Sequence, residues 1–258
     1  MAKFSTDLFE RKLLAGLTCL MLVLLTATIS VADLTSGLVA YWPLDGNAED
    51  VIGGLSVEVM GDPEWLSGKD AWIGDGTLLC DGVDDHILAG AFNPSEETGD
   101  LSIAIWVTLN EHKETMFLKK GDDWSDNNMM WQFEMDSAGD LSIGRNGSNP
   151  WFGVAMELKD WVHLAVTVGN ENAILYIDGK SAGEGGFIMG TGTESTLRIG
   201  ATQVPHRFID GMLDEVMLYE RALSPEEVEM LASGIDQNII LAVKPTGKLS
   251  STWAAIKQ

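Results

Sequence analysis

The stretch Leu101-Ser-Ile-Ala-Ile-Trp-Val-Thr-Leu109 decides the fold class of this 258-residue chain, because its side chains alternate in character along the sequence. Ile103, Ile105 and Val107 fall on one face of an extended strand. The opposite face carries smaller residues, namely Ser102, Ala104 and Thr108. A period of two residues is typical of a strand with one buried face, so we expect a half-buried β-strand here.

Five other segments have the same strand character. They are short, rich in β-branched and aromatic residues, and bounded by clusters of Gly, Asn and Asp. These segments are Leu38–Leu44, Met130–Met135, Trp161–Val168, Ala173–Ile177 and Ser195–Ile199. No long Pro- or Ser-rich linker separates them, so we expect a single all-β domain over residues 33–235, followed by a tail over residues 236–258.

Turn and helix signals complete this pattern. The pair Asp178-Gly179 supplies the positive φ angles of a tight hairpin turn, and residues 137–140 predict a second turn. Ser224 followed by Pro225 and two glutamates predicts the start of a short helix that continues to Ala232. Many short strands with one short C-terminal helix indicate a sandwich of two antiparallel sheets.

The N-terminal residues 1–32 predict a secretory signal peptide. Basic residues precede the apolar run Leu13–Val31, and the small residues Ser30 and Ala32 precede Asp33, which places the expected cleavage after Ala32. The alternative is a retained membrane anchor, because the run is about as long as a short transmembrane helix. We favour cleavage, which predicts a secreted or cell-surface protein without a stable membrane anchor.

The charge and cysteine content restrict the possible partners. The chain has 39 acidic and 16 basic residues, a formal net charge of −23. Such a field repels phosphate, which disfavours nucleic acids and anionic membranes and suits cations or neutral sugars. Removal of the signal peptide leaves Cys80 as the one cysteine, so an internal disulfide is excluded and the fold depends on its own core.

Seven motifs, taken in order, resemble those of laminin-G-like jelly-roll domains of the concanavalin A-like lectin and glucanase superfamily. They lie at Gly37–Asn47, Leu79–Ile87, Leu101–Val107, Trp161–Val168, Leu175–Gly179, Leu197–Gly200 and Phe208–Ser224. The resemblance covers nearly all of the chain after residue 37 and implies a two-sheet antiparallel jelly roll. Because this fold serves sugar binding, protein adhesion and catalysis, it leaves the function open.

The resemblance also implies a calcium site. Calcium prefers oxygen ligands, and the matching positions here are Asp45, Asn47 and Asp214. Asp45 to Asn47 also suits an ordinary turn, and Asp214 also suits hydrogen bonding to backbone amides. The carboxylate-rich loops at residues 81–85 and 122–126 are alternative calcium sites. Zinc is not expected, because the four histidines lack ligand spacing.

Aromatic residues provide the candidates for sugar recognition. Trp124, Trp131 and Trp151 lie in or beside the polar segment 120–151, where their rings would form a platform for a glycan. The alternative is that they cover the edge of the sandwich. Three other tryptophans lie in apolar strands and are expected in the core, namely Trp42, Trp106 and Trp161.

Catalysis is not expected. Related glycoside hydrolases use two nearby carboxylates and carry a third acid at an alternating position on the same strand. This chain has Glu134 and Asp136, but Ala138 and Gly139 occupy both candidate places for the third acid. The leading hypothesis is therefore a secreted, calcium-stabilised binding module for a glycan or an extracellular protein. The alternatives are a structural or adhesive surface protein without a small ligand, and a glycoside hydrolase.

Overall fold

A computed structural model of the chain describes residues 34–91, 94, 98–121, 129–145, 150–158, 160–190, 195–202 and 206–234. All of these residues belong to one unit of the chain, Val31–Gln258. The predicted signal peptide, the tail 236–258 and the loop 122–126 lie outside the described residues, so those predictions stay predictions.

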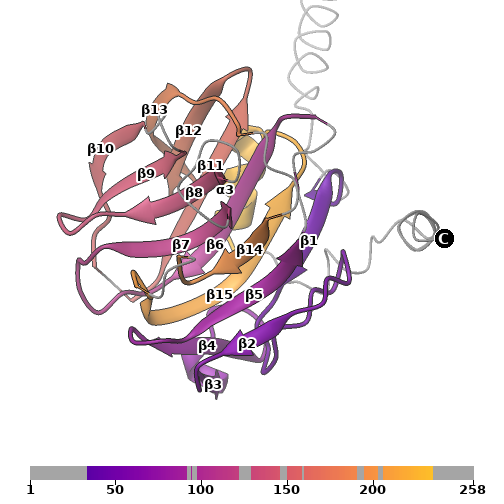
Figure 1. The fold of residues 1–258 in the computed structure, drawn as a ribbon, viewed down its shortest axis with the longest axis vertical. Helices are drawn as coiled ribbons and strands as arrows, with labels where there is room; N and C mark the ends of the chain where they lie inside the picture. Colours follow the sequence, from indigo (N-terminus) through magenta and orange to yellow (C-terminus); the bar gives the residue numbers. More distant parts are fainter. Residues whose placement is uncertain are drawn as a thin grey trace, which may run out of the picture. The chain divides into compact units, whose positions relative to one another are not determined.

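The described strands form two sheets, drawn in Figure 1. The first sheet has the order β13 (Lys180–Gly186), β12 (Asn172–Ile177), β11 (Val162–Gly169), β6 (Leu101–Val107), β15 (Asp210–Tyr219), β4 (Gly76–Asp81) and β3 (Glu64–Ser67), and β1 (Leu38–Trp42) also pairs with β15. The second sheet has the order β10 (Trp151–Ala155), β9 (Asp140–Gly144), β8 (Met129–Met135), β7 (Thr115–Gly121), β14 (Thr196–Ile199), β5 (His86–Ala91) and β2 (Glu58–Met60). The strand pairs with a described register are antiparallel, for example β6 with β11 and β8 with β9.

Strand β15 joins segments that are distant in the sequence. Its first half pairs with β4, its second half pairs with β1, and β6 lies along its other side (Figure 1). The register with β6 shifts between Asp214 and Met217, and Glu215 has a φ of 53°. A left-handed residue at a register shift is typical of a β-bulge, which re-aims the neighbouring side chains.

The main core lies between the two sheets. Ile103, Ile105 and Val107 of β6 are buried in it, as the alternation predicts. Phe133 of β8 and Phe117 of β7 meet there with ring centroids 5.2 Å apart. Cys80 is also in this core, and burial raises the pKa of its thiol to about 12, as is typical of a buried structural cysteine.

A second apolar cluster covers the outer face of the first sheet. Helix α3 (Pro225–Ala232) places Val228 and Leu231 against Ala104 of β6 and its neighbours. Ser224 caps the helix in a capping box with Glu227, as the sequence predicts. Gly179 of the β12–β13 turn has a φ of 76°, and a Cβ there would lie 2.9 Å from Cα of Glu229, so glycine allows both the turn and the close approach of α3.

The fold class, the hairpin turns and the helix predicted from the sequence are confirmed. One local prediction is wrong: β6 is not half-buried, because all seven of its residues are buried. The reason is α3, which covers the face that the alternation assigned to solvent. Strand β7 was not predicted. Among the described residues, no helix combines the length and apolar character needed to cross a bilayer.

Candidate functional site

A groove of about 200 Å³ opens on the outer face of the second sheet. Trp131, Phe133 and Met135 of β8 point into the core, so Gln132 and Glu134, which alternate with them, face the other side of the sheet. The polar and aromatic residues that line the groove, here named the β8 groove, are Glu114, Gln132, Glu134, Asp136, Trp151 and Arg207. They come from four separate parts of the chain.

Strand register brings the outward side chains of this face together. Glu134 of β8 lies opposite Ser142 of β9, and Ser142 lies opposite Trp151 of β10. Side chains directly opposite each other in an antiparallel pair share one face, so these three residues form a row across the sheet. The indole of Trp151 is 44% exposed at one end of this row.

Arg207 organises the charged part of the groove. Its backbone has a φ of 63° and its carbonyl accepts a hydrogen bond of 2.8 Å from the amide of Met116. From this position, its Nε donates to Oε2 of Glu114 at 3.0 Å and its Nη1 donates to Oε2 of Glu134 at 2.5 Å. A left-handed conformation is costly for a residue other than glycine, and such residues cluster at functional sites.

Glu134 is held at both carboxylate oxygens. Arg207 donates to Oε2, and Nε2 of Gln132 donates to Oε1 at 2.7 Å. Burial raises the pKa of Glu134, while the neighbouring Arg207 charge lowers it. Because the amide nitrogen of Gln132 faces Glu134, its Oε1 points away, and this buried oxygen has no hydrogen-bond partner among the described residues.

The three tryptophans proposed for sugar binding have different positions. Trp151 lines the β8 groove with an exposed ring. Trp131 is fully buried between the sheets, so its ring offers no face to a ligand, and the structure does not support it as a platform residue. Trp124 lies outside the described residues. The sequence did not show which of these tryptophans is buried and which is exposed, because burial depends on which face of the sheet each side chain occupies.

The β8 groove also contains residues that the sequence did not single out as binding residues. Glu114, Gln132 and Arg207 occupy separate segments and carry no local motif, so only the tertiary fold assembles them. Asp136 directly follows β8, and its Oδ1 accepts hydrogen bonds from the amides of Ala138 and Asp140 in the turn. An exposed indole beside several hydrogen-bonding groups is the arrangement that packs against a sugar ring and contacts its hydroxyls.

Asp45 and Asp214, two of the three predicted calcium ligands, hold the same loop. Asp214 is fully buried, and its Oδ2 accepts hydrogen bonds from the amides of Trp72 at 3.0 Å and Ile73 at 3.3 Å. Asp45 Oδ1 accepts from the next part of this loop, the amides of Asp75 and Gly76, both at 2.7 Å. The two carboxylates therefore tie the loop before β4 to β1 and β15.

Asp214 has the features of a carboxylate that lacks a counter-charge. Its Oδ1 is buried and has no hydrogen-bond partner in the part of the chain that the structure describes. Burial is the largest effect and raises the pKa of Asp214 to about 7. Hydrogen bonds from the backbone amides of Ile73 and Trp72 lower this pKa, and the nearby charge of Asp45 raises it. A divalent cation with oxygen ligands fits this pair. For Asn47, the structure shows only the turn contact, in which Oδ1 accepts from the amide of Glu49 at 2.8 Å.

In the acidic loop at residues 81–85, the buried carboxylate already accepts hydrogen bonds from backbone amides. Asp81, Asp84 and Asp85 each place one oxygen within 4.8 Å of the others. Asp85, the buried member, accepts hydrogen bonds from the amides of Asp62 and Asp81, both at 2.9 Å. These contacts explain Asp85 as a carboxylate that holds the loop together.

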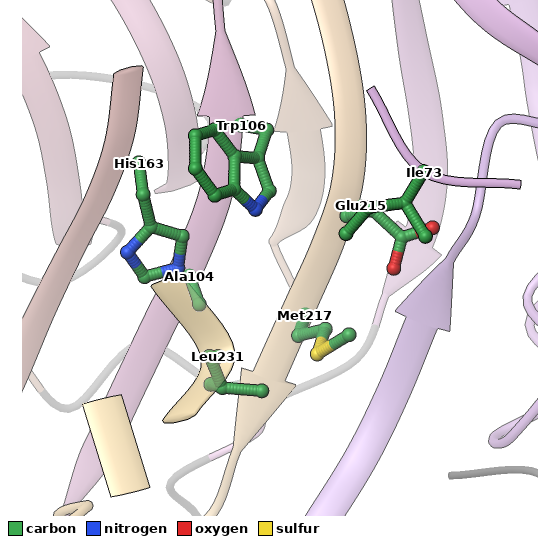
Figure 2. Close-up of a pocket in the computed structure, with 7 residues that line it drawn as sticks. All are labelled: Ile73, Ala104, Trp106, His163, Glu215, Met217 and Leu231. Atoms are coloured by element: carbon green, nitrogen blue, oxygen red, sulfur yellow. The ribbon is translucent and has the colours of Figure 1, made fainter. Parts of the chain in front are cut away.

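The outer face of the first sheet contains a different aromatic group. Figure 2 shows Trp106, His163 and Leu231 around a pocket at this face. The pocket has a volume of about 10 Å³, roughly that of one water molecule. Trp72 packs on Trp106 with ring centroids 4.5 Å apart, and Trp161 lies 6.4 Å from Trp72. Of the tryptophans predicted in the core, Trp161 is only partly buried. Among the described residues, this pocket is too small to hold a sugar ring.

Solved structures of known proteins share this fold. Domain 4 of AbnA, a GH43 extracellular arabinanase from Geobacillus stearothermophilus in complex with arabinotriose, is 20% identical, with a TM-score of 0.62 over 76% of this chain and 98% of the domain. The binding domain of botulinum neurotoxin DC in complex with SialylT is 15% identical, with a TM-score of 0.58 over 79% of this chain and 52% of that chain. Trypanosoma rangeli sialidase in complex with 2,3-difluorosialic acid is 19% identical, with a TM-score of 0.59 over 79% of this chain and 33% of the sialidase.

These identities show a common fold and leave the ligand open. The chain spans 52% of the neurotoxin chain and 33% of the sialidase, so the activities of those proteins do not transfer with the likeness. Comparison with curated protein sequences gives no match. The family model of the concanavalin A-like lectin/glucanases superfamily matches residues 81–229, more than half of the chain, so the laminin-G-like resemblance is confirmed and the chain belongs to this superfamily.

Proposed function

We propose that this protein is a carbohydrate-binding module whose ligand occupies the β8 groove. The observation that carries the proposal is the exposed indole of Trp151 beside the hydrogen-bonded array of Gln132, Glu134 and Arg207. A sugar ring has an apolar face that packs on an aromatic side chain and hydroxyl groups that both donate and accept hydrogen bonds. The groove offers both kinds of contact within one site.

The size of the groove sets the extent of the contact. Pockets that enclose drug-sized ligands measure roughly 300–1,000 Å³. At about 200 Å³, the β8 groove takes one sugar unit, and the rest of a glycan chain continues into solvent. The AbnA domain in complex with arabinotriose and the neurotoxin domain in complex with SialylT support a sugar as the class of ligand for this fold.

We infer that the groove binds without cleaving. Glycoside hydrolysis requires one carboxyl group that transfers a proton and a second that acts as base or nucleophile. Both oxygens of Glu134 are held by Arg207 and Gln132, and Asp136 Oδ1 is held by two turn amides. The absence of a third acid from positions 138 and 139 supports the same inference. The segment 1–32 supports export, so the proposed place of action is the cell exterior.

Calcium is the proposed structural cofactor. Asp45 and Asp214 would hold the ion with backbone carbonyls, and the ion would supply the positive charge that the buried Asp214 carboxylate lacks. Backbone amides of the loop 72–76 donate hydrogen bonds to both carboxylates, so the ion would stabilise the junction of β1, β4 and β15. Its role in the proposal is stability, since the β8 groove lies on the other sheet.

Two tryptophans of equal exposure provide the decisive test of the site. Trp151, 44% exposed, lies in the β8 groove, and Trp72, 45% exposed, lies on the first sheet. We expect Trp151→Ala to weaken binding to a panel of oligosaccharides by at least about tenfold, or about 1.4 kcal/mol, and Trp72→Ala to leave it unchanged. Isothermal titration calorimetry on ligands found with a glycan array measures both.

Each other outcome contradicts part of the proposal. Loss of binding in Trp72→Ala alone would move the site to the first sheet. An array without any glycan signal would reject the binding function and favour the structural or adhesive alternative. Release of sugar from a bound polysaccharide, abolished by Glu134→Gln, would show catalysis in the β8 groove.

A further inference from the structure

The exposed groups of the β8 groove are mainly hydrogen-bond acceptors. The side chain of Glu114 is 55% exposed, and Asp136 is partly exposed with one oxygen held by the turn. Gln132 Oε1 is also an acceptor, but it is buried, so Glu114 and Asp136 supply the accessible acceptor oxygens of the described lining. Ionised carboxylates accept hydrogen bonds and cannot donate them. A ligand for this groove must therefore bring donors.

The carboxylates of the groove lining outnumber its positive charge. Arg207 contacts two carboxylates, so the lining holds three carboxylates and one guanidinium, a formal charge of −2. Lys119 and Arg198 continue the same outer face in β7 and β14, but they are not part of the lining. Lys119 is fully buried, and Arg198 donates to the carbonyl of Gly121 at 3.1 Å.

From this excess of negative charge and of acceptors, we infer that the β8 groove selects neutral glycans and rejects sugars that carry a carboxylate or sulfate. This inference rests on the proposed glycan binding. A neutral hydroxyl donates a hydrogen bond to the exposed carboxylate of Glu114 or the partly exposed carboxylate of Asp136. A sugar carboxylate only accepts, so it brings no hydrogen to these oxygens and places a like charge beside them. Arabinotriose and sialylated glycans, the sugar classes found with structures of the same fold, differ in this property.

The net charge of the chain acts in the same direction but over a longer range. A formal charge of −23 repels any anion, and salt screens this repulsion beyond about 8 Å at physiological ionic strength. Mismatched acceptors in direct contact are far less sensitive to salt. Ionic strength therefore separates selection by the groove from repulsion by the whole molecule.

The test uses matched neutral and acidic sugars. Neutral fragments of arabinan, xylan, galactan and β-glucan are titrated by calorimetry against the full-length protein, together with lactose and sialyllactose. Each hexose ligand that binds is compared with the same glycan after oxidation of its primary hydroxyls to carboxylates. We expect the acidic form to bind at least about tenfold more weakly, at both about 0.15 M and about 0.5 M NaCl.

Charge-matched variants locate the origin of the selection. Glu114→Gln with Asp136→Asn removes two charges from the groove and replaces one acceptor oxygen of each carboxylate with an amide donor, so the difference between neutral and acidic ligands should shrink several-fold. Glu58→Gln with Glu64→Gln removes two exposed charges from β2 and β3, away from β8, and should leave the difference unchanged.

The outcomes separate failure of the inference from failure of the proposed function. An acidic glycan that binds as tightly as its neutral form would overturn the inference and leave the binding function in place. A difference that disappears in high salt, or that persists in the groove double variant, would also overturn it. If neither class binds, the proposed function itself fails.

Discussion

The outer faces of the two sheets differ in what covers them. On the first sheet, α3 buries an apolar cluster that includes Ala104, Val228 and Leu231, and the small pocket there holds about 10 Å³. On the second sheet, the corresponding positions of β8 carry Gln132 and Glu134, and a groove of about 200 Å³ lies above them. One face contributes stability and the other presents polar groups, so under the proposed function the outer faces of the two sheets have different roles. Mutations can test this division.

The largest effect is expected where α3 packs on the first sheet. Leu231 is 5% exposed in this cluster, so Leu231→Ala should lower the free energy of unfolding by about 3 kcal/mol through lost burial and a cavity. Leu158→Ala, at a residue that is 43% exposed, should change it by less than about 0.5 kcal/mol. Urea unfolding measures both, and glycan affinity should stay unchanged. A weaker glycan affinity in Leu231→Ala would show that the two faces are coupled.

Calcium should stabilise the junction around Asp214 by a slightly smaller amount. At a free concentration of about one hundred times its dissociation constant, the ion should add about 2.7 kcal/mol to the free energy of unfolding. Asp214→Asn should abolish this gain, and Asp84→Asn in the acidic loop should preserve it. Thermal unfolding with calcium and with EDTA gives the comparison. A melting temperature indifferent to both additions in the unmodified protein would reject the calcium site.

Acid should destabilise the first sheet through His163. Its ring is buried beside Trp106, its Nδ1 has no hydrogen-bond partner, and burial lowers its pKa to about 4. The unfolded chain, with a histidine pKa near 6.5, binds a proton at higher pH than the folded chain does. The contribution of His163 to stability is therefore complete above about pH 6.5 and is lost as the pH falls towards 4.

At pH 4.5, this loss should be about 2 kcal/mol, and His163→Gln should remove that part of the pH dependence. Urea unfolding at pH 7.5 and 4.5 measures the difference for both proteins. The same loss in His163→Gln would assign the acid sensitivity to other groups.

The smallest effect is expected in the β8 groove. Arg207→Gln removes the cation from Glu134, whose side chain is only 4% exposed, and should cost about 1–2 kcal/mol of stability. Glu114→Gln removes the other, more exposed partner of Arg207 and should cost less than about 0.5 kcal/mol. Equal losses from the two changes would mean that the Arg207–Glu134 pair has no special role in holding the groove.

The strands and the β8 groove differ in how far the sequence predicted them. Strands β6, β11 and β12 and the turn at Asp178 follow from local patterns, because alternation and turn residues act within a few positions. The β8 groove does not, since Glu114, Gln132 and Arg207 meet only when β7, β8 and the segment before β15 come together. Trp131 and Trp151 illustrate the same limit, because both are tryptophans near polar residues and only strand direction makes one buried and the other exposed.

The sequence by itself determined the all-β class, the family, the helix cap at Ser224 and the acidity of the chain, because each of these depends on residue types at close spacing. Only the tertiary structure decided that β6 is buried on both faces, that Asp45 and Asp214 hold one loop, and that Trp151 lines a groove with Arg207. The physical reason is that burial and charge pairing arise between segments far apart in the chain, so they exist only after the strands have paired and the sheets have packed.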